Sequence, residues 1–158
     1  MEETVRTLGI LNAKHFSARL DTVRLQTGRL TERIKVDHPE AAAIVAFTDP
    51  EHILMVRQWR YALGGETLEI PAGKVDRGEE IGKCAERELF EETGYKARKF
   101  MEIFNYYPAI GYSDEIIRIF LAGGLERVSE WEDKDEISQV EVVEIGRVHD
   151  MIMSGDIR

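Results

Sequence analysis

The residues best suited to do chemistry in this sequence lie in GKVDRGEEIGKCAERELFEETGY, from Gly73 to Tyr95. At about 100° per residue, one side of a helix here gathers the apolar side chains expected to face the core: Ile81, Cys84, Ala85 and Leu89. Glu88 and Glu92, one turn apart, point into the same arc. An ionised carboxylate turned toward an interior is costly unless it is paired or binds a metal. Because the two carboxylates also repel each other, we predict a raised pKa for at least one and a nearby positive charge.

The flanking sequence indicates the elements that position this helix. Asp76 to Gly78 should lead into it and Gly94 should end it. AAAIVAFT (41–48) and HILMVRQWR (52–60) are typical of buried strands joined by a DPE turn. LEIPAGK is expected to form one short strand that Pro71 and Gly73 stop.

Weaker patterns complete the expected fold. Residues 1–40 alternate charged and apolar residues around a QTG hairpin turn, which predicts an antiparallel meander. Strands are expected again near 97–107, 115–122 and 138–145. RVHDMIMSGDIR should form a last helix that ends with the chain. The order strands, helix, strands, helix predicts an α/β fold in which helices cover a mixed sheet.

Composition narrows the functional classes. A chain of 158 residues with 43% hydrophobic and 32% charged residues is long enough for one buried core with a small appendage. A net charge of −9 argues against binding polymeric DNA or RNA but not against a small phosphorylated ligand. Cys84 is the single cysteine, which excludes an internal disulfide and a cysteine-built zinc site. We interpret it as a small core residue, with a catalytic thiol as the alternative.

The start of the chain and its apolar runs bear on location. MEETVRTLGI lacks the basic stretch and long apolar run of a signal peptide. No apolar run approaches the ~20 residues that would span a bilayer. We therefore expect a cytoplasmic protein with no membrane partner.

The spacing of fixed residues around the helix resembles the Nudix box, the signature of the Nudix hydrolase superfamily. Gly73 is followed by Glu79 and then by the run Arg87-Glu88-Leu89-x-Glu91-Glu92-x-Gly94. Every fixed polar and glycine position of the box is present. Tyr95 is the one departure, because the family usually carries an aliphatic residue there.

The resemblance assigns roles to these residues. It implies that Glu88, Glu91 and Glu92 bind the metal, with the backbone carbonyl of Ala72. Arg87 would orient the glutamates and Glu79 would support the loop before the helix. Mg²⁺ suits such a site because it favours a few carboxylates, water and phosphate oxygens, and Mn²⁺ could substitute. The alternative is a solvated face of Glu–Arg pairs, which leaves the two glutamates in the apolar arc unexplained.

Segments outside the box resemble the ADP-ribose and nucleotide-sugar pyrophosphatase branch of the superfamily. They are VRQWR (56–60), LEIPAGKVDRGE (68–79) and the N-terminal meander. The branch implies a Nudix α/β/α sandwich at 41–158 and a meander at 1–40 that exchanges across a homodimer and helps build the partner's nucleoside site. The implied substrate-binding residues are Arg57, Trp59, Arg60 and Glu69. For the arginines the alternative is a surface ion pair at the strand end, and for Trp59 a core or interface position.

Two loops supply further acidic candidates. YYPAIGYSDE (106–115) resembles a loop that carries proline directly before its glycine in ADP-ribose-preferring members, whereas Ile110 stands there in this chain. Glu115 matches the acidic position at the end of that loop, near the metals. EWEDKDEI (130–137) falls where the branch keeps a catalytic or metal-linked acid, and the choices are Asp133, Asp135 and Glu136. A solvated acidic loop is the alternative.

The implied reaction is Mg²⁺-dependent hydrolysis of ADP-ribose to AMP and ribose 5-phosphate. Catalytic candidates are Arg87, Glu91, Glu92, Glu115, Asp135 and Glu136. Other substrates remain open, including CDP-choline, GDP-mannose and an oxidised nucleoside triphosphate. A non-catalytic ligand sensor is disfavoured, because such a protein would typically have lost box glutamates.

Overall fold

The computed structural model describes residues 1–157, which form two compact units. The first unit contains residues 1–40 and 106–117, and the second contains 41–105 and the chain from 118 onward. No helix among the described residues is long and apolar enough to cross a membrane.

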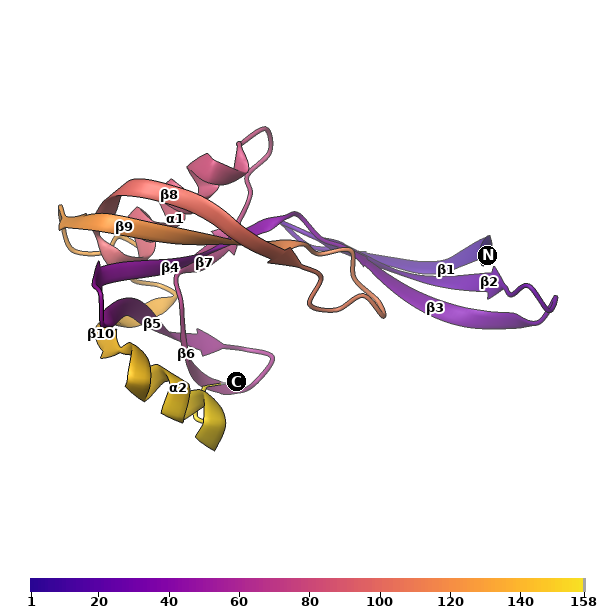
Figure 1. The fold of residues 1–158 in the computed structure, drawn as a ribbon. Coiled ribbons are helices and arrows are strands. Elements are labelled where there is room, and N and C mark those ends of the chain that lie inside the picture. Colours follow the sequence, from indigo (N-terminus) through magenta and orange to yellow (C-terminus); the bar gives the residue numbers. More distant parts are fainter. Residues whose placement is uncertain (158) are drawn as a thin grey trace. The chain divides into compact units, whose positions relative to one another are not determined.

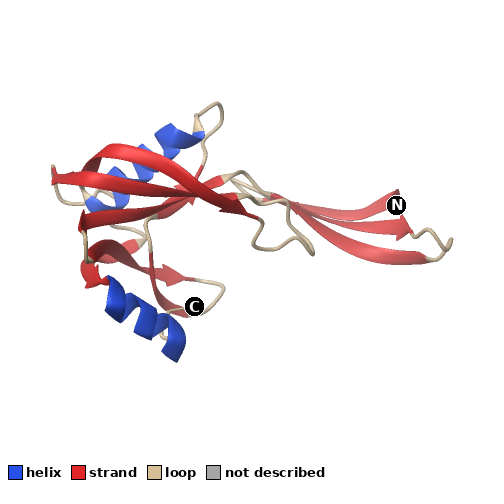
Figure 2. Cartoon of the chain, viewed as in Figure 1, coloured by secondary structure: helices blue, strands red, loops and turns tan. Residues whose placement is uncertain are grey.

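The second unit is built on a sheet with the strand order β10-β5-β4-β9-β8. In addition, β6 pairs with β5 and β7 pairs with β4 (Figure 1). The strands are β4 (Ala41–Asp49), β5 (His52–Arg60), β6 (Gly65–Glu69), β7 (Ala72–Lys74), β8 (Tyr95–Tyr106), β9 (Ile117–Arg127) and β10 (Ile137–Glu144). The helices are α1 (Ile81–Thr93) and α2 (Ile145–Ser154), drawn in blue in Figure 2.

Strands β4 and β5 are paired only near their connecting turn, at Phe47–Ile53 and Asp49–His52. Farther along, β4 pairs with β7 and β5 pairs with β6, so the sheet opens between them. One core cluster joins β4, β9, α1 and Leu54 of β5. A second joins β5, β6 and β10, with partly buried residues of α2 packed against it. This confirms the predicted mixed α/β fold with helices on both sides of the sheet.

The predicted strands at 41–48 and 52–60 are confirmed almost to the residue. Two expectations were wrong. LEIPAGK is divided between two strands, and Gly73 lies inside β7 instead of ending a strand. The last helix begins at Ile145 and ends before Gly155, whose φ of 84° is left-handed and stops the helix before the chain ends.

The first unit is an antiparallel meander of β1 (Glu3–Asn12), β2 (Ser17–Arg24) and β3 (Leu30–Asp37). Its β2–β3 turn contains Gly28 with φ 81°, as the QTG motif predicted. The 106–117 segment attaches to the edge of β3, where Val36 donates to the carbonyl of Tyr112 at 2.7 Å. Asp114 strengthens this attachment by accepting from the backbone of His38 at 2.9 Å and from Lys35 at 3.0 Å.

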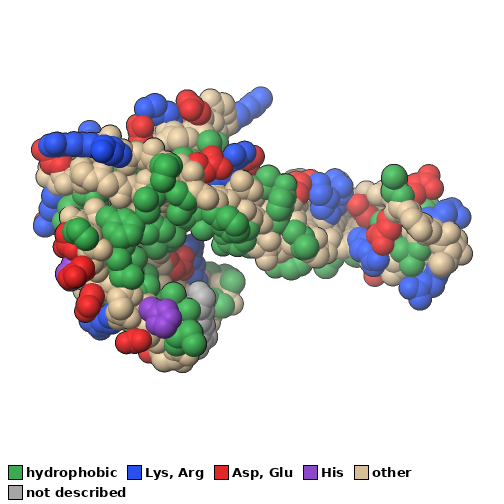
Figure 3. Space-filling view, viewed as in Figure 1, with side chains coloured by type: hydrophobic (Ala, Val, Ile, Leu, Met, Phe, Trp, Pro, Cys, Tyr) green, Lys and Arg blue, Asp and Glu red, His purple; other side chains and the backbone are tan. Residues whose placement is uncertain are grey.

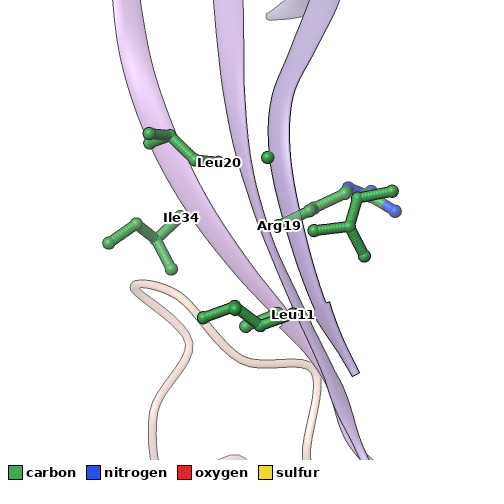
Figure 4. Close-up of a pocket in the computed structure, with 7 residues that line it drawn as sticks. Leu11, Arg19, Leu20 and Ile34 are labelled. Carbon is green, nitrogen blue, oxygen red and sulfur yellow. The ribbon is translucent and has the colours of Figure 1, made fainter.

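One face of this meander is apolar and uncovered. Leu20 lies opposite Ile34 and Ala18 lies opposite Leu11 and Val36, beside a hollow of about 260 Å³. Leu11 is 77% exposed and Ile34 58% exposed. Figure 4 shows Leu20 and Ile34 on one side of the strands and Arg19 on the other. Hydrophobic side chains accordingly reach the surface of the meander among charged ones (Figure 3).

Candidate active site

Helix α1 turns a carboxylate into the core of the second unit. Cys84, Ala85, Leu89 and Glu92 are buried, as the helical spacing predicted, whereas Ile81 is only partly buried and Thr93 is buried in addition. Gly94 ends the helix with φ 75°. Glu92 is only 4% exposed, and the side chain of Glu88, one turn earlier, is 13% exposed.

The environment of Glu92 disfavours its charged form. Burial raises the pKa of Glu92 to about 8, and the neighbouring charges of Glu88 and Asp133 add to the rise. Its Oε2 accepts a hydrogen bond from the backbone N–H of Ala72 at 2.9 Å, which partly offsets the effect of burial. Burial also raises the pKa of Glu88, against the opposing charge of Arg87. The predicted rise is therefore present, although desolvation contributes more to it than mutual repulsion.

Gly73 lets the loop before the helix approach the Glu88 carboxyl group closely. A Cβ at Gly73 would lie 2.0 Å from the carboxyl carbon of Glu88, so any larger residue would displace the glutamate or the loop. Cys84 packs beneath the same loop, with its Sγ 3.7 Å from the Gly73 carbonyl. Burial raises the pKa of the Cys84 thiol to about 12, which supports the reading of a small core residue.

Arg87 joins three glutamates and the loop. Its Nε and Nη2 donate to the two oxygens of Glu79 at 2.8 and 2.9 Å. Its Nη1 donates to Glu88 at 2.7 Å and to Glu91 at 3.0 Å, and Nη2 also reaches the carbonyl of Lys74 at 3.1 Å. This bidentate geometry supports an orienting role for Arg87 and a loop-supporting role for Glu79.

Glu79→Gln should lower stability in a pH-dependent way. Hydrogen bonding from Arg87 lowers the pKa of Glu79 from 4.5 to about 2, and its side chain is only 15% exposed. Because the folded pKa lies below the unfolded one, this stability is complete above about pH 5 and is lost as the pH falls toward 2. We expect Glu79→Gln to cost roughly 2 kcal/mol at pH 7 and almost nothing near pH 2, measured by urea unfolding. A penalty that did not change with pH would contradict the ion-pair explanation.

Arg60 and Glu69 lie on the α1 side of the sheet. Side chains alternate along β5, so Leu54 and Arg60, six residues apart, lie on the same face of the strand. Leu54 packs in the core cluster that contains α1. Both Arg60 and Gln58 donate to Glu69, the arginine through Nε at 2.8 Å. Sequence reasoning missed Gln58 and Thr67, which hold Glu69 from neighbouring positions. The available signal was Gln58 itself, a polar residue within a strand that the sequence predicts to be buried. In the structure Gln58 is only 2% exposed.

Arg57 and Trp59 lie on the opposite side of β5. They alternate with Arg60 and share the face of Ile53 and Met55, where α2 packs. Arg57 donates to Glu141 of β10 at 2.6 Å, and Trp59 is 58% exposed. The structure therefore brings Arg60 and Glu69 to the side that holds the α1 glutamates, and it does not bring Arg57 and Trp59 there.

The acidic loop 130–137 meets the end of α1. The backbone N–H groups of Glu132 and Asp133 donate to the Glu91 carbonyl at 2.8 and 3.1 Å. The charge of Asp133 contributes to the raised pKa of Glu92, and that of Glu136 contributes to the raised pKa of Arg60, after the larger effect of Glu69. Asp135 is exposed in the same loop.

Glu115 belongs to the first unit. Its carboxylate lies 3.5 Å from Nδ1 of His38, and its backbone N–H donates to Ser113 at 3.2 Å. The preceding segment carries Ile110, which is 80% exposed.

The donor set of α1 suits a hard divalent cation. Carboxylates and a backbone carbonyl are oxygen ligands, and a cation beside Glu92 would relieve the cost of its buried charge. Glu88 and Glu91 are both turned to Arg87 here, and the described residues contain no group of three acidic, histidine or cysteine side chains already arranged to hold a metal. Arg87 contacts one oxygen of each carboxylate, Oε1 of Glu88 and Oε2 of Glu91, so the second oxygen of each could bind a cation while the arginine contact is kept.

Comparison with known proteins identifies the family. Residues 37–156, most of the chain, match the family model of the NUDIX domain. The chain belongs to the Nudix family. Members of this family generally use a divalent metal ion. The assignment made from the box is thereby confirmed.

Relatives extend the likeness beyond the box. The chain is 41% identical to an ADP-ribose pyrophosphatase of Bacillus subtilis (strain 168), over 91% of this chain and 78% of the relative. It is 35% identical, over the same shares of both chains, to a methanol dehydrogenase activator of Bacillus methanolicus. A crystal structure of an ADP compounds hydrolase superposes with a TM-score of 0.77 at 23% identity, covering 98% of this chain and 85% of that one. This last match confirms the Nudix fold.

Proposed function

We propose that this Nudix protein is a Mg²⁺-dependent pyrophosphatase that hydrolyses ADP-ribose to AMP and ribose 5-phosphate. The observation that carries the proposal is the buried Glu92 beside Glu88, on the side of the sheet where Arg60 projects. A buried acidic pair facing a guanidinium group suits a cation together with a diphosphate. The relative with 41% identity, named an ADP-ribose pyrophosphatase, supports this choice of substrate.

The carboxylates of α1 and the polar residues near them have defined roles in this proposal. Glu88, Glu91, Glu92 and the Ala72 carbonyl would hold Mg²⁺, or Mn²⁺ in its place. When bound, the cation would neutralise the diphosphate and lower the pKa of a coordinated water. Arg60 would bind the diphosphate through its guanidinium fork, with Glu69 fixing its orientation. Arg87 would keep Glu88 and Glu91 in reach of the metal.

An acidic group is also needed to accept the proton of the attacking water. We assign this role to Glu136. Its loop is hydrogen-bonded to the end of α1, and its charge contributes to the raised pKa of Arg60. Asp135 in the same loop and Glu115 in the first unit are the further acidic candidates. We also propose that Trp59 contacts the nucleoside and Arg57 the substrate, both from the α2 side of β5, for which Arg57 would have to leave Glu141.

The test of this function is product identification after incubation with ADP-ribose and Mg²⁺. Equal amounts of AMP and ribose 5-phosphate are expected, and chelation with EDTA should stop the reaction. No hydrolysis, or release of ADP and free ribose, would refute the proposal. CDP-choline, GDP-mannose and an oxidised nucleoside triphosphate are the rival substrates, since Ile110 replaces the proline typical of the ADP-ribose loop. A ligand sensor that does not hydrolyse any of them is the remaining alternative.

We further propose a cytoplasmic homodimer that forms through the N-terminal meander. The apolar face with Leu11, Leu20 and Ile34 is uncovered, and a three-stranded sheet of this size buries little by itself. The opposite face is satisfied by ion pairs, such as Arg19 with Asp21 at 2.8 Å. A second copy would bury the apolar face, in keeping with the large apolar interfaces of obligate dimers.

Sedimentation velocity should therefore show a dimer at micromolar concentration. Ile34→Glu places a charge in the apolar face and should weaken the dimer at least ~10-fold in Kd. Arg33→Ala is the matched control, because Arg33 lies on the other face and pairs with exposed Glu2, and it should stay dimeric. A wild-type monomer under these conditions, or full activity after deletion of residues 1–38, would contradict the proposal.

A further inference from the structure

The loop that carries the candidate acids is attached by its backbone to the last turn of α1. Glu132 and Asp133 donate to the Glu91 carbonyl at 2.8 and 3.1 Å. Val128 and Ser129 donate to the Gly94 carbonyl at 2.9 and 3.3 Å. These bonds satisfy carbonyls that a helix end otherwise leaves unpaired. The approach is close, because a Cβ at Gly94 would lie 2.3 Å from the Ser129 carbonyl oxygen.

Asp133 connects this attachment to the start of β10. Its Oδ1 accepts the backbone N–H of Glu136 at 3.1 Å, and its carbonyl accepts the N–H of Ile137 at 3.2 Å. Trp131 braces the same turn by donating from its indole to the Ile137 carbonyl at 3.3 Å. Ile137 is 2% exposed and pairs with Gln58 of β5, which places Glu136 beside the strand end that carries Arg60.

We propose that Asp133 is a positioning residue, which sets the location of Glu136 relative to Arg60 by linking the end of α1 to the first turn of β10. The inference rests on the proposed function, in which Glu136 acts on the substrate held by Arg60. The backbone contacts of Asp133 do not depend on its side chain. The specific contribution of the Asp133 side chain is therefore its hydrogen bond to the Glu136 amide. That bond needs a short side chain with an oxygen acceptor, and it needs no negative charge.

This requirement separates a positioning role from a catalytic or metal-binding one. Asparagine offers an acceptor oxygen at the same distance along the side chain as aspartate, whereas alanine offers none. A general base or a metal ligand at position 133 would instead require the carboxylate itself. Alanine should therefore lower activity under either role, whereas asparagine should retain activity only if Asp133 is a positioning residue.

The experiment compares Asp133→Ala and Asp133→Asn in the full-length protein. Glu132→Ala is the matched control, because it removes a neighbouring exposed carboxylate and keeps the backbone bond to Glu91. We expect Asp133→Ala to lower kcat for ADP-ribose at least ~10-fold, because misplacement of a catalytic group by about 1 Å is costly, with KM nearly unchanged. Asp133→Asn and Glu132→Ala should stay within about threefold of the wild type.

Hydrogen exchange of the Glu136 and Ile137 amides, followed by NMR, gives a readout that does not depend on activity. Protection should fall in Asp133→Ala and persist in Asp133→Asn. If the wild type does not hydrolyse ADP-ribose, the proposed function fails, and amide exchange alone then tests the positioning of the loop. The inference is overturned if Asp133→Asn loses activity as severely as Asp133→Ala. It is equally overturned if Asp133→Ala retains full activity or full amide protection.

Discussion

Replacing Glu92 by glutamine should lower kcat for ADP-ribose at least ~100-fold, a loss of ~2.7 kcal/mol in transition-state stabilisation. Glutamine keeps the size and helix propensity of glutamate but removes the charge that would bind the metal. The matched control is Glu86→Gln on the same helix, where Glu86 is exposed and pairs with exposed Lys83 at 2.8 Å. Its kcat should be close to that of the wild type.

Glu92→Gln should leave the metal-free protein as stable as the wild type, or make it more stable. Burial raises the pKa of Glu92 to about 8, so the ionised carboxylate is unfavourable in the fold, whereas glutamine is neutral. The glutamine oxygen can still accept the Ala72 N–H. Mg²⁺ should raise the Tm of the wild type and of Glu86→Gln, but much less that of Glu92→Gln. Full Mg²⁺-dependent turnover by Glu92→Gln would refute the metal assignment.

Arg60→Ala should reduce kcat/KM for ADP-ribose about 100-fold, or ~2.7 kcal/mol, while the rise in Tm with Mg²⁺ persists. The substitution removes a proposed diphosphate contact and leaves the α1 carboxylates in place. Arg60→Lys should recover only part of the loss, because lysine keeps the charge without the guanidinium fork.

Two further arginines sharpen this test. Arg98→Ala removes an exposed arginine whose ion pair with Glu126 spans 3.9 Å, and its kcat/KM should match the wild type. Arg57→Ala should have a smaller effect than Arg60→Ala, because Arg57 lies on the α2 side of β5 and is bound to Glu141. If Arg57→Ala were the more damaging of the two, the diphosphate would have to be placed on the other face.

The helix and its buried glutamates could be predicted from the sequence because they depend on local signals. The 3.6-residue period placed Glu88 and Glu92 in the apolar arc, and Gly94 marked the helix end. The Nudix box also requires a glycine at position 73. The structure explains this requirement, because a Cβ at Gly73 would lie 2.0 Å from the carboxyl carbon of Glu88. Such features need no knowledge of distant contacts.

The arrangement around β5 could be predicted only in part. Alternation along a strand separates Arg57 from Arg60, but the side that faces α1 depends on how the sheet opens between β4 and β5. That opening is set by which short strand pairs with which. Pro71 in LEIPAGK signals a break between β6 and β7, but no local signal tells that β6 pairs with β5 and β7 with β4. The contact between loop 130–137 and α1 could not be predicted from the sequence either, because it is made by backbone groups that do not depend on residue type.

The most direct test of the account is a side-by-side measurement of kcat/KM with Mg²⁺ for ADP-ribose, ADP-glucose, GDP-mannose, CDP-choline and a nucleoside triphosphate. If Arg60 and the α1 carboxylates hold the diphosphate of a nucleotide sugar, both halves of the substrate contribute to its orientation. ADP-ribose should then exceed the triphosphate by about 100-fold, which requires only ~2.7 kcal/mol of differential binding. A triphosphate with the highest kcat/KM would contradict the account of the substrate while leaving the Nudix assignment in place.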